Sequence, residues 1–573
     1  MVTITLHKVH ILPMVTKEGL QRLDLEYTCS RSCHLILEVF RRETPVLREN
    51  IALLGGKGRR AVLLPEPEED FEALFQLTDR EGNILSRLET LWTRARRRTM
   101  YVVLSSHMDI GLHESQYIQR KHSADQVDGA KKCCDETAHR PAEDRYRCML
   151  EGSWAWNNYA PERGEEAARE IIEDYIKQDR IGLGCGIAGN HFQTFGLEEL
   201  CRSAYERRRL KEKWGVEGAT LFAIDINGLP VSMIQPYAEA GVKNLIFAPN
   251  HWNPLPSTVW PMDMTDPGCY LNPNASGGGT RVDVRYDSDL PMVFYWEGIG
   301  GQRLLVWAST QYGYGATPFG LEPGMKLVPE TVPRMEAAMA KSLPLLEEKY
   351  PYDVWLMCCY TDNQDPDLEV TNSIQAWNAK WAWPKLRTTA NPDTVFQTLR
   401  EKHDHLIPVL RGEMTGGWYQ HPLSAPELLA QKFQTDRNLS TAEKWSAVAA
   451  SLDENYGYPA EDFRRAWDHL LFNDEHSYGT SGYQGRRVYE TWLQHRDWID
   501  RAEATARKEG SAALKSIAGK IAATEHGLAL FNPTAQSREA AVYTEDGRYV
   551  LATVPPFGYR VVKDSQLLPF EKA

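Results

Sequence analysis

The first 98 residues alternate apolar and polar positions with a period of two. Because successive side chains of a strand point to opposite faces, such runs indicate half-buried strands. Turn-forming residues such as Glu81-Gly82-Asn83 separate the runs. The runs are residues 4–14, 23–29, 34–40, 59–65 and 73–79. Several short strands in succession predict a small antiparallel β-sandwich over residues 1–98.

From residue 99 the pattern changes to apolar, strand-like runs that alternate with helical segments. The strand-like runs are residues 101–111, 145–151, 181–189, 219–225, 243–252, 292–298, 303–309 and 354–362. This alternation is typical of βαβ units, which build a mostly parallel sheet covered by helices on both faces. It predicts the α/β fold class and one domain over residues 99–393, whose sheet is either open or closed, and we expect a closed barrel. In such folds the active site lies beyond the carboxyl ends of the strands.

The pattern of apolar and polar residues changes twice more along the rest of the chain. Residues 394–525 have a helical period, with good N-terminal helix signals at residues 424–427 and 459–461. They predict a helical bundle. Residues 526–573 return to alternation, with a hairpin turn at Glu545-Asp546-Gly547, and predict a short C-terminal β segment.

Composition narrows the class of protein. A chain of 573 residues exceeds what one hydrophobic core can organise, and its net charge of -13 opposes nucleic-acid binding. No apolar run approaches the roughly 18 residues needed to span a bilayer, and the first residues lack the features of a signal peptide. We therefore expect a cytoplasmic protein with no membrane or nucleic-acid partner. Its ten scattered cysteines are expected to be reduced core thiols.

Side chains that bind metals lie at the ends of three predicted strands. His107 and Asp109 are two residues apart and therefore project to the same side, while Asp225 and Asp362 end two later strands. Imidazole nitrogen and carboxylate oxygen are both good ligands for a borderline cation. An ordinary histidine at a polar strand end gives the same short pattern, so the rest of the chain must decide. His476 adds a second imidazole, where a predicted helix opens into a Gly-rich loop.

Five segments, in order, resemble the glycoside hydrolase family 38 α-mannosidases. They are SSHMDIG, EGSWAWNNYA, ATLFAIDINGLP, VLRGEMTGGWYQHP and LLFNDEHSYGTS. That family has HxDxG, a GGWVMNDEA-like segment, a strand ending in W-x-x-D, a segment containing GE, and a helix end with HD shortly before GT. Each match is short, but five in sequence order are specific, and they extend over about residues 99–530.

The resemblance implies a role for each matching residue. His107 and Asp109 match the metal ligands of HxD, and His476 matches the late histidine ligand. Asp225 matches the aspartate that is both metal ligand and nucleophile. Asp362 falls where the family places its general acid/base, although the two residues before it differ from the family pattern.

The implied cofactor is one divalent metal ion. Two histidines and two carboxylates suit Zn²⁺ first, with Co²⁺ or Mn²⁺ also compatible by ligand type. On the substrate side, Glu413 is expected to orient His476 or to bind a sugar hydroxyl, with a buried ion pair to Arg411 or to a neighbouring histidine as the plain alternative. The expected substrate-binding residues are Trp154, Trp252, Glu413 and Ser477.

The sequence departs from the family pattern at several positions that read the sugar. Leu112 replaces the tryptophan after HxDxG, and Phe222 replaces the tryptophan three residues before the nucleophile. Asn158 and Tyr159 replace an acidic pair, and Ser477 replaces the aspartate after the late histidine. These replacements affect residues expected to recognise the sugar and not the metal ligands or the nucleophile. The identity of the substrate is therefore less determined by the resemblance than the mechanism is.

The leading interpretation is a metal-dependent retaining α-glycosidase, with α-mannoside as the default substrate and an aspartyl glycosyl-enzyme intermediate. A second interpretation is a zinc-dependent hydrolase of another type, such as a deacetylase. A third is a degenerate member that binds metal and carbohydrate without turnover. The expected partner is a carbohydrate substrate, and self-association into a homo-oligomer is left open.

Overall fold

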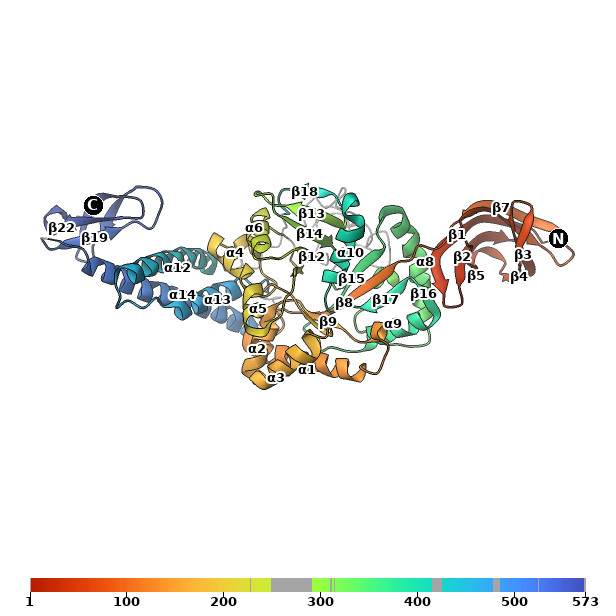
Figure 1. Ribbon diagram of the computed structural model, residues 1–573, viewed down its shortest axis with the longest axis horizontal. Helices are drawn as coiled ribbons and strands as arrows, with labels where there is room; N and C mark the ends of the chain where they lie inside the picture. Colours follow the sequence, from red (N-terminus) through yellow and green to blue (C-terminus); the bar gives the residue numbers. More distant parts are fainter. Residues whose placement is uncertain are drawn as a thin grey trace. The chain divides into compact units, whose positions relative to one another are not determined.

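The computed structural model describes residues 2–226, 228–248, 291–309, 312–313, 315–414, 425–477, 485–523 and 525–570. The chain is a mixed α/β structure (Figure 1), which confirms the predicted α/β class at that level. It divides into two compact units. Unit 1 consists of Met1–Asp109, Tyr117–Gly189 and Ala204–Trp418, and unit 2 of Ile110–Gln116, Asn190–Ser203 and Tyr419–Ala573. Across the described residues, no helix combines the length and the apolar character needed to cross a membrane.

The N-terminal part of unit 1 contains two four-stranded antiparallel sheets. One has the order β16 (Trp381–Trp383), β1 (Ile4–Thr16), β2 (Leu20–Cys29), β5 (Gly56–Pro65). The other has the order β4 (Thr44–Leu53), β3 (Cys33–Arg41), β6 (Phe71–Thr78), β7 (Ile84–Trp92). Leu23 and Leu25 of β2 share one buried core with Leu37 of β3 and Phe75 of β6. The period-two pattern therefore marks the residues that face this core.

Three further sheets of unit 1 contain the strands that position the candidate site. They are β15 (Val354–Asp362), β8 (Thr99–His107), β17 (Lys385–Thr388); β10 (Ile181–Leu183), β9 (Cys148–Leu150); and β11 (Thr220–Ile224), β12 (Asn244–Ala248), β14 (Arg303–Ala308), β13 (Val293–Glu297), β18 (Val409–Arg411). Their pairings are parallel except for β13 with β14. The described strands thus form separate sheets, and closure into a barrel stays a prediction.

The antiparallel pair β13–β14 departs from the expected βαβ pattern for a simple reason. Only residues 298–302 join the two strands, and the amide of Gly298 donates to the carbonyl of Gln302. A connection this short can only form a hairpin, because a parallel crossover needs a dozen or more residues.

Helices connect and cover these strands in unit 1 (Figure 1). They are α1 (Gln116–Glu136), α2 (Ser153–Arg163), α3 (Glu165–Glu170), α5 (Glu206–Trp214), α6 (Ile234–Glu239), α8 (Thr331–Lys349), α9 (Glu369–Lys380) and α10 (Asp393–His403). Helix α10 precedes β18, which pairs with β13 within unit 1. The predicted boundary between catalytic domain and bundle at residues 393 and 394 stays a prediction.

In the described part of unit 2, long helices follow one shorter helix along the chain (Figure 1). The helices are α4 (Leu197–Ala204), α12 (Pro426–Leu452), α13 (Ala460–Asn473) and α14 (Gly485–Gly519). Leu439 of α12, Trp467 and Leu470 of α13, and Ala502 of α14 pack in one buried cluster. The C-terminal strands form the sheets β19 (Gly527–Phe531), β22 (Tyr559–Lys563) and β20 (Arg538–Tyr543), β21 (Arg548–Val554), β23 (Leu568–Pro569).

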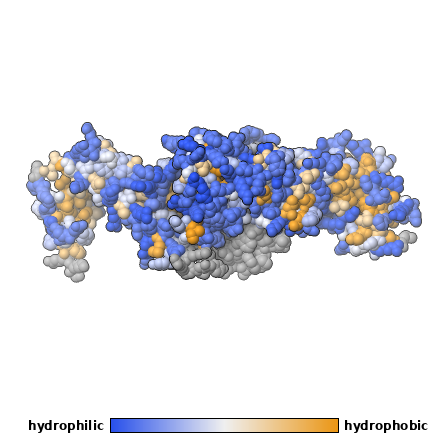
Figure 2. Space-filling view, turned by 90° about the horizontal axis from the view of Figure 1, so that it is seen from below, coloured by the Kyte–Doolittle hydropathy of each residue, from blue (hydrophilic) through white to orange (hydrophobic). Residues whose placement is uncertain are grey.

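The molecular surface is mainly hydrophilic on the face drawn in Figure 2. Apolar side chains gather there over the N-terminal sheets and over the C-terminal strands. Exposed apolar residues include Leu54 and Leu63 in the former region and Leu551 and Phe557 in the latter.

Candidate active site

The candidate site of unit 1 begins where β8, β11 and β15 end. His107 is the last residue of β8, and the parallel register places it beside Asp362, the last residue of β15. Asp225 directly follows β11, and Asp109 lies two residues beyond β8. His107 is 0% exposed, Asp109 2% and Asp225 4%. The ends of β8 and β11 therefore bury the His107 imidazole and the carboxylates of Asp109 and Asp225.

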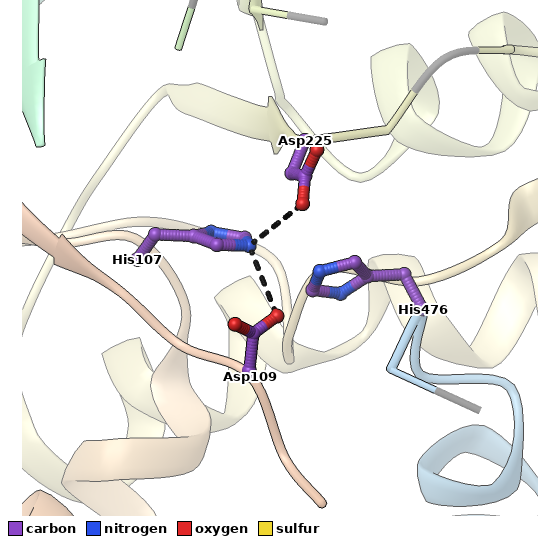
Figure 3. A group of neighbouring side chains, drawn as sticks. All are labelled: His107, Asp109, Asp225 and His476. Atoms are coloured by element: carbon purple, nitrogen blue, oxygen red, sulfur yellow. Dashed lines mark ion pairs between the residues drawn. The ribbon is translucent and has the colours of Figure 1, made fainter. Parts of the chain in front are cut away.

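Three of these side chains point toward one another (Figure 3). His107 Nε2 lies 3.6 Å from Asp109 Oδ1 and 3.6 Å from Asp225 Oδ2. The candidate ligand atoms of all three lie within 4.8 Å of one another. Two donors bound to zinc at about 2.1 Å and at a tetrahedral angle lie roughly 3.4 Å apart. The spacing and the donor types therefore fit one metal ion.

A glutamate orients the His107 ring. The Glu151 carboxylate lies 3.0 Å from Nδ1 of His107 and accepts the backbone amide of Met108 at 2.9 Å. Burial alone would lower the pKa of His107, but the Glu151 charge and the bonds to Asp109 and Asp225 raise it well above its ordinary value. A carboxylate at Nδ1 fixes the tautomer whose Nε2 can bind a metal.

The backbone at Asp225 has an uncommon conformation. Its φ is 58°, in the left-handed region that few residues other than glycine adopt, although aspartate tolerates it. Its amide still donates to the carbonyl of Ala248, at 2.9 Å, so the turn after β11 is tied to the end of β12. This turn directs the Asp225 carboxylate toward His107 (Figure 3).

Asp362 lies beside this group, and its carboxylate contacts Tyr312. The Tyr312 hydroxyl donates to Oδ2 of Asp362 at 3.0 Å. One carboxylate oxygen of Asp362 lies within 4.8 Å of one of Asp109. Burial raises the pKa of Asp362, and the Asp109 and Asp225 charges raise it further, against the opposing effect of His107 and Tyr312. An aspartate in such surroundings retains its proton to higher pH than usual.

Asn363 anchors the backbone that carries Asp109. Its Oδ1 accepts the Asp109 amide at 3.0 Å, and its Nδ2 donates to the Asp109 carbonyl at 3.1 Å. The Asn363 amide donates to the carbonyl of His107 at 2.9 Å. The ends of β8 and β15 are therefore fixed together.

The predicted substrate-binding residues lie in different elements and have different contacts. Trp154 is the second residue of α2 and is buried, and its backbone amide donates to the carbonyl of Ile187. Glu413 accepts the amide of Val231 at 2.7 Å, whereas Arg411 pairs with Glu297. Trp252 lies outside the described residues. The substrate-binding role of each stays a prediction.

In unit 2, His476 lies three residues after α13 and is buried. Its Nδ1 is 2.5 Å from a Glu475 carboxylate oxygen, and Ser477 donates to Glu475 through its amide at 3.0 Å and its hydroxyl at 3.1 Å. Glu475 thus places a carboxylate at Nδ1 of His476, as Glu151 does at Nδ1 of His107. Figure 3 draws His476 with the three residues of unit 1.

The sequence interpretation missed Glu151, Tyr312, Asn363 and Glu475. Glu151 follows the apolar strand β9, which is the signal that identified Asp225, so the same reasoning could have found it. Tyr312 contacts a residue 50 positions away and Asn363 one 254 positions away. Nothing in their local sequence indicates those contacts.

Comparison with known proteins identifies the family. The model described as the glycosyl hydrolases family 38 N-terminal domain matches residues 97–413. An alpha-mannosidase from Enterococcus faecalis V583 has a TM-score of 0.59 at 17% identity, covering 78% of this chain and 46% of that one. A protein of glycosyl hydrolase family 38 from Enterococcus faecalis has a TM-score of 0.51 at 14% identity, covering 78% and 44%.

These two likenesses show a shared fold, and this chain spans less than half the length of either structure. A search of curated proteins finds no match. The matched domain covers more than half of the 573 residues and contains His107, Asp109, Asp225 and Asp362. The chain therefore belongs to glycosyl hydrolases family 38.

Proposed function

We propose that this protein is a metal-dependent retaining α-glycosidase that hydrolyses α-mannosides by default. The observation that carries the proposal is the buried group of His107, Asp109 and Asp225, whose ligand atoms lie within 4.8 Å of one another in a family 38 chain. The name of the Enterococcus faecalis V583 structure, an alpha-mannosidase, supports the choice of sugar.

The proposed metal site has four protein ligands. His476 is proposed as the fourth ligand because it matches the family's late histidine, which gives two imidazoles and two carboxylates with His107, Asp109 and Asp225. This donor set suits Zn²⁺, with Co²⁺ and Mn²⁺ as further candidates. A bound cation would supply a Lewis acid that could hold adjacent sugar hydroxyls and help distort the ring toward an oxocarbenium-like transition state.

The two aspartates divide the chemistry. The Asp225 carboxylate attacks the anomeric carbon and forms a covalent glycosyl-enzyme, while Asp362 protonates the departing oxygen. Asp362 then takes a proton from the incoming water, which releases the sugar from Asp225. Because Tyr312 donates to Oδ2 of Asp362, Oδ1 is the oxygen that transfers the proton.

One experiment tests the proposal directly. A panel of aryl α-glycosides is assayed with metal-stripped and zinc-loaded protein, and a fluorosugar is used to trap the intermediate for mass spectrometry. We expect zinc-dependent hydrolysis and a covalent adduct on Asp225. Zinc binding without hydrolysis or adduct would identify a non-catalytic member, whereas zinc-dependent hydrolysis of an acetylated sugar without an adduct would identify a deacetylase.

The metal ligands are tested separately from the chemistry. Replacing His107 by Ala removes one imidazole, so the purified variant should retain much less zinc than the wild type by elemental analysis. An unchanged zinc content in His107→Ala would rule out this site.

A further inference from the structure

Unit 2 contains a buried cluster of three charged side chains, Lys432, Glu199 and Asp474. Lys432 of α12 lies 2.6 Å from Glu199 of α4 and 2.7 Å from Asp474, the residue after α13. Its ammonium also donates to the carbonyl of Thr194 at 2.6 Å. Lys432 and Glu199 are 0% exposed and Asp474 3%. The ammonium therefore donates hydrogen bonds to Glu199 and to the Thr194 carbonyl and forms an ion pair with Asp474.

Stability alone does not account for such a cluster. Transferring charges from water to a protein interior costs several kcal/mol per ion, and well-packed apolar side chains often stabilise as much or more. The cluster instead fixes the positions of its members, because one ammonium holds three groups at once. Here the acceptors belong to three separate segments, namely the chain before α4, α4 itself and the end of α13.

Further contacts hold the same segment. The Asp474 carbonyl accepts the amide of His191 at 2.8 Å, and Asn190 forms a β-bridge with Glu475. The Asn190 side chain also donates to the carbonyl of Leu471 at 2.7 Å. The chain from the last turn of α13 to Glu475 is thus fixed by both its backbone and the Asp474 side chain, and Glu475 orients His476.

We propose that Lys432 is a positioning residue for the metal site, which fixes Asp474 and thereby the direction of His476 two residues later. The inference rests on the proposed function, since it takes His476 as a metal ligand. Residues that orient metal ligands typically contribute 10–100-fold in metal affinity. Loosening Asp474 should therefore weaken zinc binding although every ligand remains.

The test compares two conservative variants of unit 2. Asp474→Asn removes the charge that Lys432 holds. Glu443→Gln is the matched control, because Glu443 of α12 pairs with Arg202 of α4 at 2.8 Å and accepts Trp467 of α13, so it joins the same three helices without touching residues 474–476. The dissociation constant for zinc is measured above pH 7 by competition with a chelator, together with the absorption spectrum of the cobalt-loaded protein and the thermal midpoint.

We expect both variants to lower the thermal midpoint, but only Asp474→Asn to weaken zinc binding, by about tenfold or more, and to change the cobalt spectrum. Lys432→Met should weaken it at least as much. Wild-type affinity and spectrum in Asp474→Asn would overturn the inference, as would an equal loss of affinity in Glu443→Gln.

His476→Ala separates this inference from the proposed function. If His476→Ala weakens zinc binding but Asp474→Asn does not, the metal site stands and the positioning role is wrong. If His476→Ala leaves the affinity unchanged, His476 is not a ligand and both claims about it are wrong.

Discussion

At the scale of single residues, both candidate histidine ligands have a glutamate at Nδ1. Glu151 serves His107 in unit 1, and Glu475 serves His476 in unit 2. A carboxylate there fixes the ring tautomer and makes the other nitrogen a better donor. Both glutamates also accept a backbone amide, from Met108 and Ser477 respectively, so each is itself held in place.

We predict that Glu151→Gln weakens zinc binding by about 10–100-fold. The amide can still accept one hydrogen bond, but it lacks the charge that stabilises the ring. A chelator competition assay measures the effect, and Glu297→Gln is the control because Glu297 pairs with Arg303 and Arg411 away from the metal ligands. An affinity in Glu151→Gln equal to that of the control would assign Glu151 a structural role only.

We predict that Asp362→Asn retains its zinc but loses activity selectively. Glycosides with poor leaving groups need a proton from the acid, whereas activated aryl glycosides hardly need it, so the former should slow far more. Rates for both classes of glycoside provide the measurement. Wild-type rates for both would place the acid elsewhere, with Asp365 and Asp367 as the next candidates.

We predict that Tyr312→Phe moves the alkaline fall of kcat/KM to higher pH. The Tyr312 hydroxyl bonds to the Asp362 carboxylate and lowers the pKa of that group, so removing the hydroxyl should raise the pKa. The acid works only when protonated, and activity therefore falls as the pH rises through that pKa. An alkaline limb that is unchanged in Tyr312→Phe would mean that the limb reports another group.

Strand ends could be predicted from sequence because the apolar, strand-like runs stop at them, which is how His107 and Asp225 were found. Contacts between distant loops could not. Asn363 clamps the backbone of Asp109 across 254 positions, and its own neighbours along the chain give no sign of that partner. Local pattern thus predicts where a ligand lies, while the residues that orient it follow from tertiary packing.

At the scale of elements, the predicted and observed sheets differ where the connection between two strands is short. The runs at residues 292–298 and 303–309 do form β13 and β14, but the five residues between the end of one and the start of the other allow only an antiparallel pair. The helical period also extended over α10, which is followed by β18. Periodicity identifies an element and does not specify the element beside which it packs.

Helix α4 is an element whose start depends on a buried acid. The amide of Gly196, just before the helix, donates to the Glu199 carboxylate at 2.6 Å, in the manner of a capping box. Burial raises the pKa of Glu199 to about 7, and the Asp474 charge adds to this while Lys432 opposes it. Asp436 is another acid whose charge interacts with that of Glu199. Burial and the Glu199 charge raise the pKa of Asp436 to about 6.

We predict that α4 becomes less protected as the pH rises toward 7. The folded-state pKa of Glu199 lies above its ordinary value of 4.5, so the protonated form stabilises the fold fully below that value. This contribution is lost as the pH rises through about 7. Hydrogen exchange of the α4 amides, corrected for intrinsic rates, measures it. Glu199→Gln cannot titrate and should show a flatter profile, and an equally steep profile in that variant would exclude Glu199 as the cause.

At the scale of the whole molecule, the proposed metal ligands extend beyond the residues that match the family domain. Residues 97–413 match the family domain and include three of the four proposed ligands, whereas His476 lies beyond the match. The assignment of His476 therefore depends on the fifth sequence segment, LLFNDEHSYGTS, and on its glutamate-oriented ring in unit 2. A test of His476 is a test of whether the catalytic function extends past the family domain.

We predict that zinc protects both units in the wild type but only unit 1 in His476→Ala. A ligand that binds only the folded state stabilises it by about 2.7 kcal/mol when its free concentration is 100 times Kd. If the ligands come from both units, zinc should slow hydrogen exchange at the end of β8 and at the end of α13 together. His476→Ala retains the three donors of unit 1, so β8 should still respond at higher zinc concentration while α13 does not. Zinc-independent exchange at the end of α13 in the wild type would show that His476 does not bind the metal, and would leave the site to His107, Asp109 and Asp225.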